Sequence, residues 1–151
     1  MADLEEALQL AASKFKISEL NTHQKFAIRK IVVEKEDLFV NLPTGSGKSF
    51  IYQAIPLVFD HISDDNGHIV VVVSPLISLM EDQVKYLRSL GLSAVNISSD
   101  SEVDCSKIEK GQYSIVYGSP EAWLLNERWR SMLSNDVYAS KLCAVDRKSV
   151  V

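Results

Sequence analysis

The chain has 151 residues, enough for one α/β domain with a real core and too few for two. Its 46% of hydrophobic and 24% of charged residues are typical of an ordinary soluble globular protein. Its formal net charge of −4 argues against a nucleic-acid binder that relies on bulk basicity, but not against one that uses backbone amides and helix ends. Without a secretory signal or an apolar run long enough to cross a bilayer, we expect an intracellular protein with no membrane partner. Its two cysteines, Cys105 and Cys143, lack metal-ligand spacing and are expected to be free thiols.

Two amphipathic helices are predicted at the start of the chain, over residues 3–15 and 22–33. Each carries apolar residues at helical spacing on one face. These residues are Leu4, Leu8, Ala11, Ala12 and Phe15 in the first helix, and Ala27, Ile28, Ile31 and Val32 in the second. Gln24 projects from the same face at the start of the second helix. Its amide either reads a planar ligand through paired donor and acceptor groups or is satisfied by a loop carbonyl.

The strongest motif lies between an apolar strand predicted at 37–40 and a helix predicted at 49–59. It reads Leu42, Pro43, Thr44, Gly45, Ser46, Gly47, Lys48, Ser49. A Gly-rich turn followed by a helix N-terminus points backbone N–H groups at one anion. Lys48 is expected to reach the β- and γ-phosphates of a nucleotide, and the Ser49 hydroxyl to take a Mg²⁺ coordination position. The alternative is an ordinary Gly-rich turn, since the strict pattern has Gly where this chain has Leu42.

Strands alternate with helices along the rest of the chain, which predicts a parallel sheet covered by helices on both faces. The strands are predicted at 69–73, 92–97, 113–117 and 141–145. A helix is predicted to open at Ser78, with Met80, Val84 and Leu87 inward and Gly91 at its end. Another is predicted to open after Ser119, with Pro120 as its first helical residue.

The helix after Ser119 is predicted to place Leu125, Trp129 and Leu133 on one side, with the tryptophans in the core. Ligands of parallel sheets bind at the carboxyl ends of strands. We therefore expect the motif at 42–49, Ser74-Pro75 and Ser119-Pro120 to share one rim.

Three segments together resemble RecQ-type DNA helicases. They are residues 42–53, which end in Tyr52-Gln53, residues 73–83, which read Val-Ser-Pro-Leu-Ile-Ser-Leu-Met-Glu-Asp-Gln, and Ser119-Pro120-Glu121. The match covers nearly all of residues 15–145 and corresponds to the first RecA-like lobe, a P-loop NTPase fold. We accordingly assign residues 1–145 to this lobe.

The resemblance implies ATP-dependent unwinding of DNA, in which ATP hydrolysis opens and closes a cleft between two RecA-like lobes. Residues 42–49 would bind ATP with Mg²⁺, and Gln24, with Phe15 and Leu20 ahead of it, is similar to the family's adenine-recognition motif. Lys16 departs from that motif, where a Gly is usual.

The resemblance also implies a surface for single-stranded or forked DNA. The residues that would contact its backbone are Ser74, Pro75, Leu76, Ser119 and Pro120. Standing alone, each Ser-Pro would be merely a helix start. The family's roles in DNA repair and recombination would place the protein in the nucleus of a eukaryotic cell.

The family's next motif reads Asp-Glu-Ala-His directly after a strand. Asp146 is in place to hold Mg²⁺ and joins Lys48 as a catalytic candidate, but Arg147 stands where the Glu that activates the attacking water belongs. We interpret residues 146–151 as a non-native tail, because a common sequencing-library adapter encodes Asp-Arg-Lys-Ser-Val-Val in one reading frame. The chain alone is then expected to be inactive as a helicase.

Two other functions fit parts of the sequence. One is a non-catalytic short isoform that binds nucleotide or DNA. The other is a small P-loop kinase, which would need a lid and an acceptor-binding Arg cluster that the sequence does not display.

Overall fold

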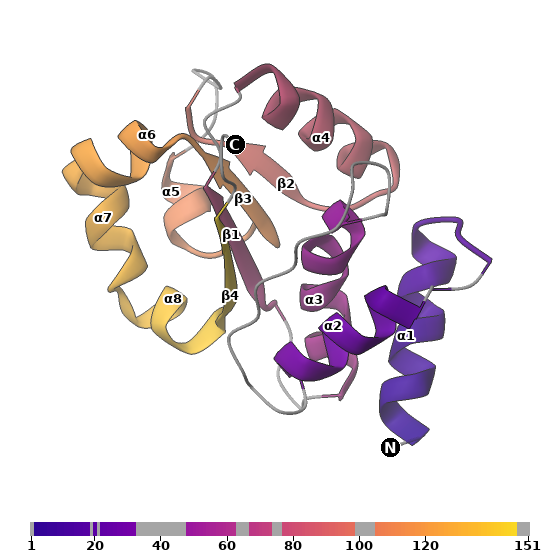
Figure 1. Ribbon diagram of the computed structural model, residues 1–151. Coiled ribbons are helices and arrows are strands. Elements are labelled where there is room, and N and C mark those ends of the chain that lie inside the picture. The colour runs from indigo at the N-terminus through magenta and orange to yellow at the C-terminus, as the bar shows by residue number, and fades with distance from the viewer. Residues whose placement is uncertain are drawn as a thin grey trace. The chain divides into compact units, whose positions relative to one another are not determined.

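The computed structural model describes residues 2–18, 20, 22–32, 48–62, 67–73, 77–98 and 105–147 (Figure 1). The chain divides into two compact units, Met1–Asn66 and Gly67–Val151, and each has its own architecture. The strand predicted at 37–40 lies outside the described residues.

The first unit is built from three helices. They are α1 (Ala2–Lys14), α2 (Thr22–Val32) and α3 (Lys48–Ile62), and both α1 and α2 pack against α3 (Figure 1). The predicted apolar stripes of α1 and α2 are buried, apart from the partly exposed Ile31. The third helix is apolar on most of its surface, as expected of a helix with neighbours on more than one side. Its buried apolar side chains are Phe50, Ile51, Tyr52, Ala54, Ile55 and Val58.

Helix α1 ends in a left-handed residue that is not glycine. Lys16 has a φ of 59°, its N–H donates to the carbonyl of Ser13 at 3.0 Å, and the Ile17 N–H donates to the carbonyl of Ala12 at 2.8 Å. This pair of bonds is the Schellman motif, in which glycine normally occupies the left-handed position. The Gly expected from the family resemblance therefore has a conformational reason at position 16.

The second unit contains a four-stranded parallel sheet in the order β2-β3-β1-β4. Its strands are β1 (Ile69–Val73), β2 (Ala94–Asn96), β3 (Ile115–Gly118) and β4 (Leu142–Arg147), each close to a predicted strand. The central strand β1 is buried along almost its whole length, which is typical of a parallel sheet covered on both faces. The predicted parallel α/β architecture is confirmed in this unit.

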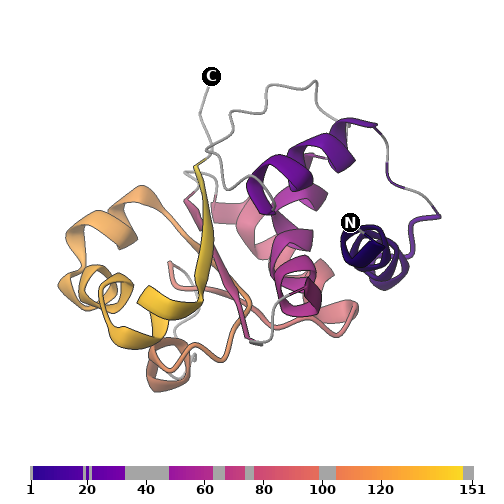
Figure 2. The same ribbon diagram turned by 90° about the horizontal axis from the view of Figure 1, so that it is seen from below.

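Helices cover both faces of the sheet. The chain passes from β1 to β2 through α4 (Ile77–Ser89), then returns across the sheet through α5 (Cys105–Glu109) and the three helices that follow β3. Because parallel crossovers are right-handed, this reversal sends α4 to one face and the later helices to the other (Figures 1 and 2). The core on the latter face consists of Ile69, Val71, Val95, Ile108, Val116, Trp123, Trp129, Met132 and Tyr138.

The helical stretch after Ser119 differs from the prediction, because it is three short helices rather than one. They are α6 (Pro120–Leu125), α7 (Glu127–Leu133) and α8 (Asp136–Lys141). Asn126 and Asn135 begin the later two, since the side-chain oxygen of each accepts a backbone N–H of the new helix. The break turns Leu125 outward, where it is 79% exposed, so its predicted place beside Trp129 in the buried stripe is wrong.

The start and end of α4 also show how local chemistry shapes the chain. The helix begins at Ile77, so Ser78 lies inside it rather than at the predicted capping position. Its end is as predicted: Gly91 has a φ of 83°, and the N–H groups of Gly91 and Leu92 return to the carbonyls of Arg88 and Leu87. Met80, Val84 and Leu87 are buried as expected.

Candidate functional site

In the first unit, one of the predicted adenine-recognition residues, Phe15, contacts the start of α3. Phe15, Leu20 and Gln24 are all buried, and the Phe15 ring packs edge-to-face on Phe50 with 5.0 Å between ring centroids. Phe50 follows Ser49 directly, so this aromatic pair attaches the segment before Gln24 to the first turn of α3. Such edge-to-face pairs add about 0.5–1.5 kcal/mol beyond their burial.

Helix α3 begins at Lys48, as the nucleotide-binding motif requires. Its 15 residues place a helix N-terminus directly after the Gly-rich turn, where unpaired N–H groups and the helix dipole favour an anion. Residues 42–47 of the motif lie outside the described residues, and the predicted phosphate and Mg²⁺ contacts of Lys48 and Ser49 remain predictions.

In the second unit, three strands end side by side at one rim. Val73 of β1 is the register partner of Gly118 of β3 and of Arg147 of β4, and Asp146 pairs with Val72. Ser119 follows β3 immediately, so it lies at the carboxyl-end rim, as predicted, and Asp146 near the end of β4 lies at the same rim. Residues 74–76 lie outside the described residues.

Ser119 connects the end of β3 to the beginning of α6. Its hydroxyl oxygen accepts the Ala122 N–H at 3.1 Å, and Pro120 is the first helical residue, which confirms the predicted cap. Its own N–H donates at 2.6 Å to the hydroxyl oxygen of Ser98, which lies just after the end of β2. Ser119 is 7% exposed, so both bonds are largely protected from bulk water.

The turn before Ser119 depends on a close approach between Gly118 and Trp123. A Cβ built on Gly118 would lie 2.8 Å from Trp123 Cε2 and 2.9 Å from Ile97 Cγ1, and closer still to Trp123 Nε1. The indole Nε1–H is buried and has no hydrogen-bond partner in the described part of the chain. The absence of a side chain at position 118 lets the indole lie against the strand.

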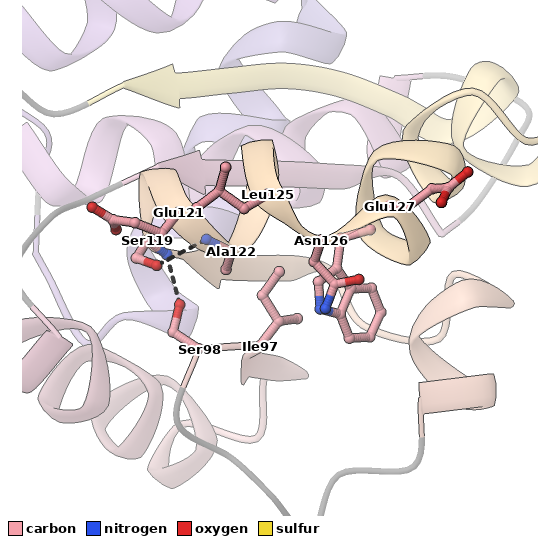
Figure 3. Close-up of a pocket in the computed structure, with 9 residues that line it drawn as sticks. Ile97, Ser98, Ser119, Glu121, Ala122, Leu125, Asn126 and Glu127 are labelled. Carbon is pink, nitrogen blue, oxygen red and sulfur yellow. Dashed lines mark hydrogen bonds between the residues drawn. The ribbon is translucent and has the colours of Figure 1, made fainter.

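An open groove of about 560 Å³ runs beside Ser119 (Figure 3). It is lined by Ile97, Ser98, Ser119, Glu121, Ala122, Leu125, Asn126, Glu127 and Trp129. Among these described lining residues there is no Lys or Arg, whereas two carboxylates are present. The groove can therefore donate hydrogen bonds from hydroxyl groups but offers no positive side chain to a phosphate.

Two negative findings limit the chemistry of the described residues. No group of three or more His, Cys, Asp or Glu side chains among them could hold a metal ion. None of the described helices has the length and apolar character needed to cross a membrane.

Sequence patterns did not single out Ser98, which proves to be a direct partner of Ser119. It lies in a polar stretch after β2 without a recognisable motif. Its importance follows only from the pairing of β2 with β3, which brings the ends of the two strands together.

Comparison with known proteins identifies the family. The model of the DEAD/DEAH box helicase family matches residues 21–146. The chain belongs to the DEAD/DEAH box helicase family. This span includes α2 with Gln24, the start of α3 at Lys48, and the rim with Ser119 and Asp146.

The individual relatives of this chain include ATP-dependent DNA helicases that are named RecQ or Q1. It is 32% identical to a putative ATP-dependent DNA helicase Q1 of Caenorhabditis briggsae over 94% of its length, and 32% identical to ATP-dependent DNA helicase RecQ of Bacillus subtilis over 95%. A third relative, ATP-dependent DNA helicase Q1 of Mus musculus, is 35% identical over 77% of the chain. These similarities confirm the predicted RecQ-type resemblance. The helicase chain spans 23%, 23% and 18% of the lengths of these relatives.

Proposed function

We propose that the chain is the nucleotide-binding part of a RecQ-type ATP-dependent DNA helicase and carries part of its surface for single-stranded DNA. The observation that carries the proposal is the family match over residues 21–146, which contains the phosphate-binding motif with Lys48 and Ser49 at the start of α3. In this proposal, residues 42–49 bind the phosphates of ATP, Lys48 contacts the β- and γ-phosphates, and Ser49 holds Mg²⁺.

Gln24 is proposed to read the adenine. Its burial at the start of α2 and the Phe15–Phe50 contact support this role, because they hold the segment around Gln24 against the helix that begins with Lys48. A buried amide offers a donor and an acceptor in one plane, which suits the edge of a base.

The DNA surface is proposed to include Ser74, Pro75, Leu76, Ser119 and Pro120. Support comes from the rim, where β1 and β3 end in register immediately before the two Ser-Pro pairs. Because two carboxylates and no basic side chain are found among the described residues lining the groove, DNA binding should depend on neutral hydrogen bonds. We expect weak binding with a shallow dependence on salt. The substrate would be single-stranded or forked DNA in repair and recombination, in the nucleus of a eukaryotic cell.

A non-catalytic role for this particular chain is the second candidate, and Arg147 favours it. Arg147 extends β4 next to Asp146, at the position where the family has the Glu that activates water. We propose that Asp146 would hold Mg²⁺ in an intact motif, and that residues 146–151 are a non-native tail after the lobe at 1–145. DNA-stimulated ATP turnover by the purified chain, absent in Lys48→Ala, would refute the inactive assignment. A genomic exon encoding residues 147–151 in frame would refute the interpretation of residues 146–151 as a non-native tail.

Nucleotide binding is the direct test of the proposal. Lys48→Ala should weaken the binding of ATP with Mg²⁺ by about ten- to a hundredfold, because hydrogen bonds to a charged group contribute about 1.5–3 kcal/mol. Isothermal calorimetry on the whole chain measures the affinity. Lys85→Ala, which removes an exposed lysine from α4, is the matched control and should bind like the unmodified chain. Equal affinity for all three proteins would remove the phosphate-binding assignment.

A further inference from the structure

Helix α2 is basic, although the whole chain carries a formal net charge of −4. It contains Lys25, Arg29 and Lys30 and neither aspartate nor glutamate. Every other described helix contains at least one acidic residue. Among the described helices, α2 therefore stands out as a concentration of positive charge in an acidic chain.

Phe26 lies at the centre of the exposed face of α2. With 3.6 residues per turn, Phe26 and Arg29 are on the side of the helix opposite its buried residues, Lys25 is at one edge of this face and Lys30 at the other. Phe26 is 56% exposed, and the Lys30 Nζ lies over its ring, 5.5 Å from the centroid. One exposed phenylalanine is ordinary by itself. Here it is flanked by cations on both edges, so the face combines an apolar centre with positive sides.

The cations on this face are placed unfavourably for the chain alone. Lys25 and Arg29 are four residues apart, a spacing at which like charges repel and weaken a helix. Lys25 also lies near the amino end of α2, where the helix dipole disfavours positive charge. Neither residue forms an ion pair with any side chain in the described part of the chain. A bound anionic partner would relieve this repulsion.

The shape of the face favours a peptide over a strand of nucleic acid. Single-stranded nucleic acid binds in positively charged grooves where successive bases stack on aromatic side chains. The exposed face of α2 is instead the convex surface of one helix, with one aromatic ring that already carries the Lys30 ammonium. Such a surface suits a second helix, which places apolar side chains at the centre of the contact and opposite charges along its edges.

We propose that the exposed face of α2 is a docking surface for an acidic amphipathic helix of a partner protein. An apolar side chain of that helix covers Phe26, while its carboxylates pair with Lys25 and Arg29. The arginine guanidinium can hold a carboxylate through two parallel hydrogen bonds. The buried Gln24 lies on the opposite side of α2, so this surface is separate from the proposed adenine contact and does not depend on the nucleotide or DNA assignments.

Binding of a defined peptide to the whole chain tests the proposal. The probe is a fluorescein-labelled peptide of glutamate and leucine in which the leucines follow a heptad pattern on one helical face. A peptide of the same composition with its leucines scrambled around the helix is the control for net charge. Fluorescence anisotropy at low salt should show binding of the patterned peptide and much weaker binding of the scrambled one. The affinity should fall as salt screens the charge pairs.

Substitutions separate the charge pairs from the apolar contact. Lys25→Gln combined with Arg29→Gln should weaken peptide binding about five- to tenfold at low salt and less at high salt. Phe26→Ala should weaken it by about as much at every salt concentration, because apolar burial is not screened. Glutamine is a good helix former, so the double variant should keep the melting temperature of the unmodified chain. Lys85→Gln combined with Lys107→Gln removes two exposed lysines from the second unit and should leave binding unchanged.

The other outcomes overturn the proposal. A chain that does not bind the patterned peptide, or binds the scrambled peptide equally well, has no such docking surface. If the control variant at positions 85 and 107 loses as much affinity as the α2 variant, the attraction belongs to the chain as a whole. If an oligothymidylate displaces the peptide and Phe26→Ala weakens the binding of both, the face binds nucleic acid and the peptide assignment is wrong. None of these measurements uses ATP, so their failure leaves the Lys48 test of the nucleotide assignment intact.

Discussion

Placing a methyl group at position 118 should destabilise the second unit, because the strand and the indole of Trp123 leave no room for it. The new Cβ of Gly118→Ala would lie 2.8 Å from Trp123 Cε2 and 2.9 Å from Ile97 Cγ1. Trp123 is 4% exposed and its ring is rigid, so relief requires a shift of α6 against β3. Overpacking of this kind costs about 1–3 kcal/mol.

A smaller opposing term comes from the unfolded chain. Alanine has fewer unfolded conformations than glycine, and Gly118 does not occupy the left-handed region, so the substitution recovers about 0.4–1 kcal/mol. The net loss should be about 1–2 kcal/mol. For a chain of this size, it corresponds to a fall of about 2–8 °C in melting temperature. Differential scanning calorimetry or urea unfolding would measure it.

The steric cause can be isolated with a double-mutant cycle. Trp123→Phe removes the Nε1 that a Cβ at position 118 would approach most closely, together with a buried donor that has no partner. In that background Gly118→Ala should cost less, with a coupling of about 0.5–2 kcal/mol. Gly67→Ala is the control, since its φ is 83° but nothing lies within 4 Å of its Cβ, and its cost should not respond to Trp123→Phe. An unchanged melting temperature in Gly118→Ala, or the absence of coupling, would refute the close-approach explanation.

Two further substitutions test other parts of the fold. Lys16→Gly should stabilise the first unit by about 0.5–1 kcal/mol, because Lys16 is exposed and has a left-handed φ that glycine adopts without strain. The substitution should therefore raise the melting temperature, and a lower melting temperature would contradict this explanation. Tyr138→Phe should cost about 1–2 kcal/mol, because the buried hydroxyl donates to the Ile108 carbonyl at 2.8 Å. Burial, aided by Glu109, also raises the pKa of Tyr138 above its usual value. The stabilising contribution of that hydroxyl is therefore complete below about pH 10 and declines by about 1.4 kcal/mol per pH unit above it. Urea titrations at alkaline pH should accordingly show a smaller difference in the free energy of unfolding between the unmodified chain and Tyr138→Phe.

The strands and the buried faces of the long helices could be predicted from the sequence because they depend on periodicity. The apolar run at 69–73 indicates a strand covered on both faces, and Met80, Val84 and Leu87 indicate one face of a helix. Both patterns are confirmed by burial in the structure. Each is a property of neighbouring residues along the chain, so no tertiary information is needed.

The break in the helical stretch after Ser119 could not be predicted from the same periodicity. Leu125, Trp129 and Leu133 have perfect helical spacing, yet Asn126 turns its side chain back onto the N–H of Arg128 and starts a new helix. This competition between a side chain and the continuing helix is local and short-ranged. The signal in the sequence for this new helix start is an Asn followed at once by an acidic residue, as at Asn126-Glu127.

The candidate site also has one part that could be predicted from the sequence and one part that could not. The cap at Ser119 could be predicted, because Ser-Pro-Glu is a helix-start pattern in itself. The Ser98 contact could not, because it depends on β2 lying next to β3 in the sheet, and strand order is not encoded in any short segment. A residue whose role arises from strand order becomes visible only in three dimensions.

The sheet order also has a consequence for how the protein is made on the ribosome. β1 leaves the exit tunnel long before either of its partners, since β3 and β4 both lie far downstream in the chain. At about 5–20 residues per second, its uncharged Ile-Val-Val-Val-Val sequence waits for seconds without the strands that complete its hydrogen bonds. Such a segment combines high β-propensity with no charge, which favours pairing with another chain. Newly made chains should therefore depend on a chaperone during this interval, more than the stability of the finished sheet would suggest.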